Sequence, residues 1–156
     1  VYNAYSGACR IFSLHFLLGT SPTLYEDGEM VRDYVNIHDV VDANLLVLED
    51  PRAVGRVFNV GGGTPYTTRQ FAEIVQAHYR SDQQGRVTGE YRFGDTRHIF
   101  SDVSALEALG WTPRRTPADS VAEYAEWLKG MPGLDEVLAD ADAKMKSLGV
   151  VRESAG

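Results

Sequence analysis

The sequence predicts an α/β fold in which short strands lie among packed helices. Apolar residues recur at helical spacing in several segments, short extended segments separate these, and turn or capping residues mark the junctions. The 156 residues contain no internal repeat and no low-complexity tract. A chain of this length buries about two-thirds of the surface that it exposes when unfolded, so it is long enough to form a core.

The expected elements follow from these patterns in chain order. Helices are expected at residues 6–18, 38–49, 67–79, 102–110 and 116–129. Strands are expected at residues 23–25, 30–36, 56–60 and 90–93.

Periodicity and stop signals define the first two helices. The first is apolar over most of its length, which predicts burial, and it ends at Gly19 because glycine readily adopts the left-handed conformation of a helix end. The second carries apolar residues at helical spacing and ends at Asp50, because a residue that precedes proline disfavours the helical conformation.

A turn introduces the strand at residues 30–36. Asp27 and Gly28 predict this turn, since glycine adopts positive φ without steric cost. Side chains alternate along a strand, so Arg32 and Asp33 are expected on opposite faces.

Capping residues mark the later helices. Thr67 and Gln70 form a predicted capping box, in which each side chain bonds the backbone N–H of the other. Thr116 and Pro117 combine a cap with proline at the first helical position.

Residues 130–133, Gly-Met-Pro-Gly, form a linker that divides the chain. We therefore expect a main domain at residues 1–130 and a C-terminal part at residues 131–156, which consists of the linker, an amphipathic helix and a tail. The apolar stripe of that helix consists of Leu134, Val137, Leu138, Ala141, Met145 and Leu148.

Composition argues against several classes of protein. The single cysteine, Cys9, can form no disulfide within the chain, which favours a reducing compartment. The sequence has neither a run of about 18 apolar residues nor a basic and then apolar leader, so we expect a cytoplasmic protein without membrane contact. The net charge of −7 and the scattered arginines argue against nucleic acid as a partner and favour a small anion.

Residues 26–43, together with residues 58–63 and the Arg-Phe-Gly-Asp run at residues 92–95, resemble the C-terminal part of NAD-dependent nucleotide-sugar epimerases and dehydratases. These enzymes belong to the extended short-chain dehydrogenase/reductase family, and the resemblance covers residues 3–128. It implies that this chain is the small substrate-binding domain of such an enzyme, with the N-terminal Rossmann domain absent.

The family's glycine-rich dinucleotide loop and its Tyr-x-x-x-Lys catalytic pair do not occur in this sequence. The resemblance implies NAD as the cofactor of the complete enzyme. We expect this chain alone to bind no cofactor and to be inactive, and we assign no catalytic or metal-binding residue to it.

Arg32 and Arg92 are the predicted diphosphate ligands. A guanidinium group is always charged, and its planar fork matches phosphate oxygens. From spacing alone, an isolated arginine in a strand is more often a surface or salt-bridged residue. In the resembled family these two positions carry the arginines that bind the diphosphate.

Asp95 is expected to act beside Arg92, either by accepting hydrogen bonds from a ribose or by orienting an arginine. The resemblance implies the ribose contact. From the residues alone, Gly94 and Asp95 also fit a turn in which the carboxylate bonds its own backbone. Arg97 and His98 follow directly, and neither is assigned a role.

Further contacts are expected from segments nearer the N-terminus. The resemblance implies that backbone groups of Thr23 and Tyr25 bind the imide edge of uracil or thymine, although an edge strand with Tyr25 packed in the core explains the same residues. Ser6 and Gly7 open the first helix, whose N–H groups and dipole would attract the diphosphate.

The expected function is the substrate-binding portion of an NAD-dependent nucleoside-diphosphate-sugar 4-epimerase of the dTDP-rhamnose or UDP-sugar type. A nucleotide-sugar dehydratase or decarboxylase of the same family would share these residues. A non-catalytic module that binds nucleotide sugars or proteins is a further alternative. The expected partners are a UDP- or dTDP-linked sugar and either the missing Rossmann half or a second copy of the chain, with residues 56–60 or the last helix at the contact.

Overall fold

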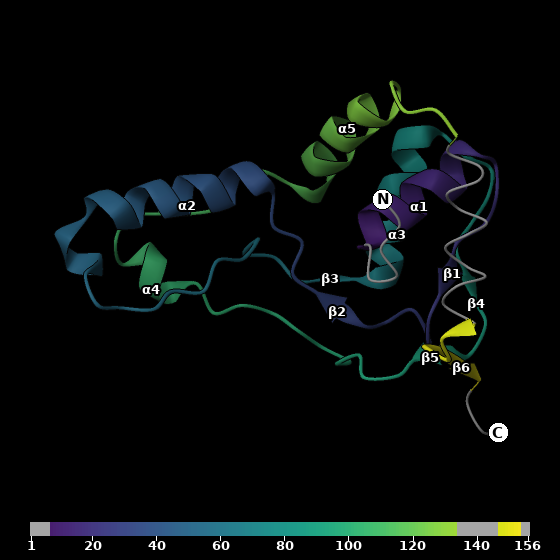
Figure 1. Ribbon diagram of the computed structural model, residues 1–156, viewed down its shortest axis with the longest axis horizontal. Helices are drawn as coiled ribbons and strands as arrows, with labels where there is room; N and C mark the ends of the chain where they lie inside the picture. Colours follow the sequence, from purple (N-terminus) through teal and green to yellow (C-terminus); the bar gives the residue numbers. More distant parts are fainter. Residues whose placement is uncertain (1–6, 134–146, 154–156) are drawn as a thin grey trace.

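A computed structural model describes residues 7–133 and 147–153 of the chain. Figure 1 shows α1, α3 and α5 gathered at one side, α2 and α4 at the other, and β2 and β3 between them. In chain order the elements are α1 (Ala8–Leu17), β1 (Thr23–Leu24), β2 (Val31–Arg32), α2 (Ile37–Glu49), the 3-10 helix η1 (Pro51–Ala53), β3 (Tyr66–Thr67), α3 (Thr68–Tyr79), β4 (Arg86–Val87), β5 (Glu90–Arg92), α4 (Ser104–Glu107), α5 (Pro117–Leu128) and β6 (Val151–Glu153). The predicted class, α/β with short strands and packed helices, is confirmed.

The strands pair as three two-stranded sheets within the described residues. β1 and β4 are parallel, whereas β2–β3 and β5–β6 are antiparallel. Arg32 lies opposite Tyr66 in β2–β3, and Arg92 lies opposite Val151 in β5–β6. Pairs this short are not stable by themselves, so packing against the helices must hold them.

The larger apolar core lies among α1, α3 and α5 (Figure 1). Phe71 and Val75 of α3 and Val121 of α5 are buried in it. Tyr34 stacks on Phe71, with ring centroids 3.9 Å apart. This stack fixes the chain against the core two residues after Arg32.

A second apolar cluster, which contains Ala43, Leu106 and Trp111, joins α2 to α4. Beside it the Asp39 side chain is only 1% exposed. Its carboxylate accepts the backbone N–H groups of Arg114 (3.1 Å) and Arg115 (3.0 Å) and the Nη1 of Arg115 (2.6 Å). Burying a carboxylate is costly unless it is paired and hydrogen-bonded, and here both conditions are met.

Several local signals for helix ends agree with the structure, whereas the helix expected at residues 102–110 covers only Ser104–Glu107. The capping box of Thr67 and Gln70 opens α3, and Thr116 caps α5 and forms a second capping box with Asp119. After α1 the chain turns at Gly19, with φ of +69°.

Two predicted strands differ from the structure. β2 covers Val31–Arg32 rather than residues 30–36. Residues 56–60 form no strand among the described residues, because nothing there pairs with their backbone, and Phe58 and Val60 pack against the second cluster instead. The predicted last helix lies almost entirely outside the described residues, and the boundary at residue 130 stays a prediction.

The outer face of α2 is apolar and accessible. Four side chains spaced along it are each at least 47% exposed: Ile37, Val41, Leu45 and Leu48. Among the described residues, no helix has both the length and the apolar character that crossing a membrane requires.

Candidate functional site

Three of the predicted site residues meet at one point. Arg32 lies on β2, Arg92 lies on β5, and Asp95 follows β5. The Oδ2 atom of Asp95 is 3.8 Å from Arg32 Nη2 and 3.9 Å from Arg92 Nη1. The side chain of Arg32 is 23% exposed, that of Arg92 is 19% exposed and that of Asp95 is 35% exposed. Two guanidinium groups thus converge on one accessible oxygen, an arrangement that suits an oxygen anion.

A tight turn positions Asp95. Its backbone N–H donates to the Arg92 carbonyl at 3.2 Å, and Gly94 adopts φ of +85°, which a residue with a side chain rarely does. A turn is therefore present at Gly94 and Asp95, closed by this backbone bond, and the carboxylate lies toward the two arginines. The pairing of β5 with β6 continues into this turn, because Phe93 N–H donates to the Val150 carbonyl at 3.0 Å.

Backbone carbonyls hold the Arg32 guanidinium. Its Nη1 donates to the carbonyls of Val31 and Arg97, both at 2.9 Å. Its Nη2 lies 3.8 Å from the sulfur of Met30. With Nη1 held in this way, Nη2 is the end that faces Asp95.

Thr23 and Tyr25, predicted to contact the base, lie in and just after β1. The turn that follows them is tied to β5, because Glu26 N–H donates to the Glu90 carbonyl at 2.7 Å. β5 also carries Arg92, so the same strand positions both this segment and one of the two arginines. A shallow hollow of about 370 Å³ beside the turn is lined by Glu26, Asp27, Gly89 and Tyr91.

Gly7 is the N-cap of α1, and its carbonyl accepts the N–H groups of Arg10 and Ile11. These backbone bonds lie within the first turn of α1 and do not connect Gly7 with the arginine pair. Ser6 lies outside the described residues. The two helix-end contacts therefore stay predictions.

Sequence patterns do not single out Asp33, yet its side chain secures β2 from the opposite face. Its Oδ1 accepts the Gly62 N–H at 2.6 Å, and its Oδ2 accepts the Ser101 N–H at 3.0 Å. A Cβ atom at Gly61 would overlap this carboxylate, and one at Gly62 would come within 2.6 Å of the Tyr34 carbonyl. Glycines are needed here so that the chains can approach closely. The only sequence signal is the alternation that places Asp33 opposite Arg32.

The turn after β1 is also bonded to Arg97, the residue to which sequence patterns assign no role. Arg97 Nη1 bonds Glu26, and its Nη2 is 2.5 Å from Asp27 Oδ2. The hydrogen bond from Arg97 lowers the pKa of Asp27, and the same contact raises the pKa of Arg97. Both groups therefore stay charged around neutral pH.

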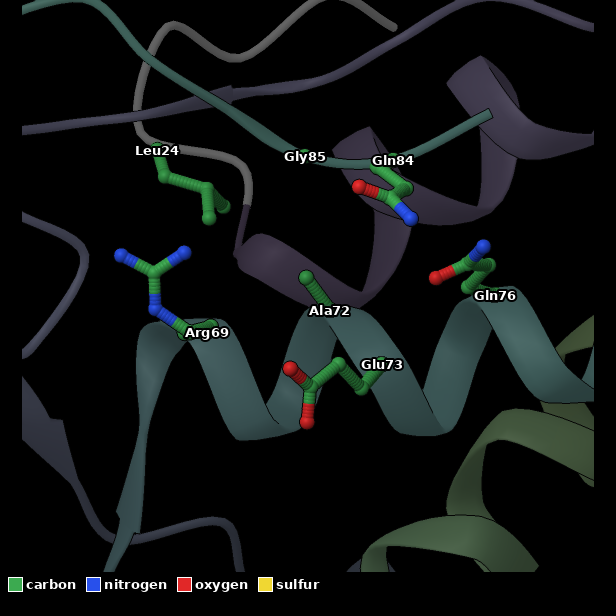
Figure 2. A pocket seen from close by; sticks show the side chains of 7 residues that line it. All are labelled: Leu24, Arg69, Ala72, Glu73, Gln76, Gln84 and Gly85. Carbon is green, nitrogen blue, oxygen red and sulfur yellow. The ribbon is translucent and has the colours of Figure 1, made fainter. Parts of the chain in front are cut away.

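A separate pocket of about 150 Å³ lies beside α3, and Figure 2 shows Arg69 pointing toward Leu24 of β1 and Gln76 toward Gln84. Arg69 is already bonded to Glu29 Oε1 and to the Asp27 carbonyl, each at 2.8 Å. The described residues contain no group of three or more His, Cys, Asp or Glu side chains able to hold a metal ion. The pocket is lined by Leu24, Arg69, Ala72, Glu73, Gln76, Gln84 and Gly85, none of them a predicted ligand.

Comparison with known proteins gives a family for this arrangement. Residues 4–61 match the sequence pattern of the NAD-dependent epimerase/dehydratase family. Over 128 residues the chain is 35% identical to the dTDP-L-rhamnose 4-epimerase of Burkholderia thailandensis, a match that covers 81% of this chain and 35% of that enzyme. The chain belongs to the NAD-dependent epimerase/dehydratase family. It is also 32% identical over 125 residues to the UDP-glucose 4-epimerase of Mycolicibacterium smegmatis, which covers 80% of this chain and 39% of that enzyme.

Solved structures of this epimerase/dehydratase family have the same fold over the shared part. The UDP-glucose 4-epimerase of Thermotoga maritima, solved with UDP-glucose, matches with a TM-score of 0.72 and 31% identity, over 81% of this chain and 41% of that chain. The UDP-N-acetylglucosamine 4-epimerase of Methanobrevibacter ruminantium, solved with UDP-N-acetylmuramic acid, matches with a TM-score of 0.72 and 28% identity. This match covers 80% of this chain and 40% of that chain. The chain spans 35–39% of the length of the first curated relatives it matches.

Proposed function

We propose that this chain is the substrate-binding portion of an NAD-dependent nucleoside-diphosphate-sugar 4-epimerase. The observation that supports this most directly is the convergence of Arg32, Arg92 and Asp95 at one accessible point. Relatives named for dTDP-L-rhamnose and UDP-glucose point to a sugar linked to dTDP or UDP as the substrate.

In this proposal Arg32 and Arg92 bind the diphosphate. Arg32 offers its Nη2, because carbonyls hold its Nη1, and a guanidinium group matches phosphate oxygens in both charge and geometry. The diphosphate replaces Asp95 as the counter-ion of the pair, and the Asp95 carboxylate then accepts hydrogen bonds from the ribose. Backbone groups of Thr23 and Tyr25 bind the base, on the side where the turn is tied to β5. The N-terminus of α1, at Ser6 and Gly7, gives the diphosphate a second contact.

NAD supplies the hydride chemistry of epimerisation when it is bound. The run of three glycines in this chain does not fit its pyrophosphate. The triple-glycine turn at residues 61–63 is closed by Asp33, whose carboxylate already accepts the Gly62 N–H and would repel a phosphate. We therefore assign NAD to the portion of these family members that this sequence does not span.

We also propose that two exposed regions contact that NAD-binding portion. One is the outer face of α2, and the other is residues 56–60, which lack a strand partner in the described structure and include the exposed Val57. Backbone groups without partners and exposed apolar side chains are both typical of contact surfaces. A second copy of the chain is the alternative occupant of these regions.

Calorimetric titration of the chain with UDP, dTDP and GDP tests the substrate proposal. Arg32→Ala and Arg92→Ala should each weaken UDP or dTDP binding about tenfold or more, since a charge-assisted hydrogen bond contributes about 1.5 to 3 kcal/mol. Arg52→Ala is the matched control, because Arg52 bonds Asp50 at 2.6 Å beyond the end of α2. Equal losses in all three variants, or no nucleotide binding by the unaltered chain, would contradict the proposal.

A further inference from the structure

The loop after β5 lies along β2 and uses both backbone groups of Val31. Val31 N–H donates to His98 Nδ1 at 3.2 Å, and the Val31 carbonyl accepts the Ile99 N–H at 3.1 Å. His98 also forms a parallel bridge with Val31. These contacts fix the position of the loop one residue before Arg32.

The Arg97 side chain extends from the same loop to the turn after β1. Its guanidinium bonds the carboxylates of both Glu26 and Asp27. Glu26 has φ of +53°, a conformation that is uncommon for a residue with a side chain and that persists when surrounding contacts hold it. Arg97 is one of those contacts, and the bond from Glu26 N–H to the Glu90 carbonyl is another.

The backbone of Arg97 orients Arg32. The Arg97 carbonyl accepts Arg32 Nη1 at 2.9 Å, which leaves Nη2 facing Asp95 at 3.8 Å. A shift of this carbonyl would rotate or release the Arg32 guanidinium. The position of the Arg97 carbonyl is fixed by the Arg97 side chain and by the contacts of His98 and Ile99 with Val31.

We propose that Arg97 and His98 are positioning residues that hold Arg32 in place and connect the diphosphate site to the turn beside Thr23 and Tyr25. This inference rests on the proposed function, because it assigns the two ends of the connection to the diphosphate and the base. Arg97 is not itself a phosphate ligand in this proposal, since its guanidinium is engaged by two carboxylates. UDP would occupy both the diphosphate site and the base site, whereas inorganic pyrophosphate would occupy only the diphosphate site. The binding of UDP should therefore depend on Arg97 and His98 more than the binding of pyrophosphate does.

Calorimetry with UDP and with inorganic pyrophosphate separates these roles in the 156-residue chain. Arg97→Gln should weaken UDP binding by about 1.5-fold to fivefold, the range expected from losing an accessible ion pair, and should weaken pyrophosphate binding less. Adding Asp27→Asn to Arg97→Gln should cause little further loss, because both changes break the same contact. Arg52→Gln, which breaks the comparable contact with Asp50, should change neither affinity.

Amide hydrogen exchange gives a second readout that needs no ligand. The amides of Val31 and Ile99 should exchange several-fold faster in Arg97→Gln and in His98→Ala. His98→Asn retains an acceptor near the position of Nδ1 and should restore slower exchange at Val31. The Arg52→Gln variant should leave both rates unchanged.

Each outcome decides a different point. A larger loss for pyrophosphate than for UDP in Arg97→Gln would make Arg97 a phosphate ligand and overturn the inference. Unchanged amide exchange at Val31 and Ile99 would show that the Arg97 contacts are an ordinary surface ion pair, and it would also overturn the inference. If the unaltered chain binds neither ligand, the proposed function fails, and faster exchange in the variants would still support the positioning of the loop by Arg97 and His98.

Discussion

Replacing Asp95 with asparagine is expected to tighten the binding of inorganic pyrophosphate to this chain. The substitution retains the size of the side chain and removes a negative charge that lies 3.8 Å from Arg32 Nη2 and 3.9 Å from Arg92 Nη1. Pyrophosphate would then meet two arginines without having to displace their counter-ion.

Coulomb's law sets the scale of this effect. Two unit charges about 4 Å apart interact by about 1 kcal/mol in water and about 4 kcal/mol at an effective dielectric constant of about 20. Because the three side chains are partly accessible, each pair should contribute about 0.2 to 1 kcal/mol. Two such pairs amount to about 0.4 to 2 kcal/mol, or roughly twofold to thirtyfold in pyrophosphate affinity.

Calorimetric titration at low and at physiological ionic strength measures the effect. The gain should shrink as salt is added, because the site is accessible to screening ions. UDP should gain less than pyrophosphate, since asparagine is a weaker acceptor for ribose hydroxyl groups than a carboxylate. Asp82→Asn, in an exposed loop, makes the same change in net charge and serves as the control. Unchanged or weaker pyrophosphate binding in Asp95→Asn would refute the reasoning and indicate that Asp95 instead orients the arginines.

Three further predictions concern stability and association. Asp39→Ala should lower the free energy of unfolding by roughly 3 kcal/mol or more, because it removes a buried carboxylate and leaves two partly buried N–H donors and a guanidinium without their acceptor. Asp42→Ala, at a more accessible position, should lower it by about 1 kcal/mol or less. Urea titration measures both losses, and equal losses would contradict the account of Asp39. Burial raises the pKa of Tyr34 from 10.0 to about 12, so the unfolded chain loses this proton at lower pH than the folded chain, and stability should fall by roughly 2 to 3 kcal/mol more in the unaltered chain than in Tyr34→Phe as pH rises through that interval. Parallel urea titrations at the two ends of the interval test this, and parallel losses in both proteins would show that Tyr34 does not titrate as described. The chain should self-associate at micromolar concentration, and replacing both Val41 and Leu45 with lysine should reduce its mass in light scattering because it charges the outer face of α2; an unaltered chain that is monomeric would count against exposed contact surfaces.

The helices were predictable because their signals are local. The capping box of Thr67 and Gln70 spans four positions, and the glycine that ends α1 adjoins the last helical turn. Strands depend on partners that a short pattern does not contain. Residues 56–60 have the composition of a strand, yet they form none among the described residues because no neighbouring backbone pairs with them.

The candidate site was predictable only in part, for the same reason. No local rule connects Arg32 with Arg92, and it was the family resemblance that indicated both of them together with Asp95. The structure shows that these three side chains converge, and their ligand role stays a prediction. The roles of Asp33 and Asp39 were missed because their carboxylates bond backbone groups that lie far along the chain, at Ser101 and near Arg115.

The segment from β2 into α2 should tolerate substitution poorly, because Tyr34 stacks on Phe71 and the side chains beside Tyr34 make contacts of their own. Arg32 reaches the candidate site, Asp33 the glycine turn, and Tyr34 the larger core, while Asn36 caps α2 and also donates to Ser120 of α5 at 3.0 Å. Neighbouring side chains thus serve separate parts of the molecule, so a substitution that shifts the shared backbone of this segment acts on stability and on binding at once. Variation that changes ligand preference without destabilising the fold is therefore better tolerated at the exposed positions of the loop after β5 that do not position Arg32 than in the segment that carries Arg32.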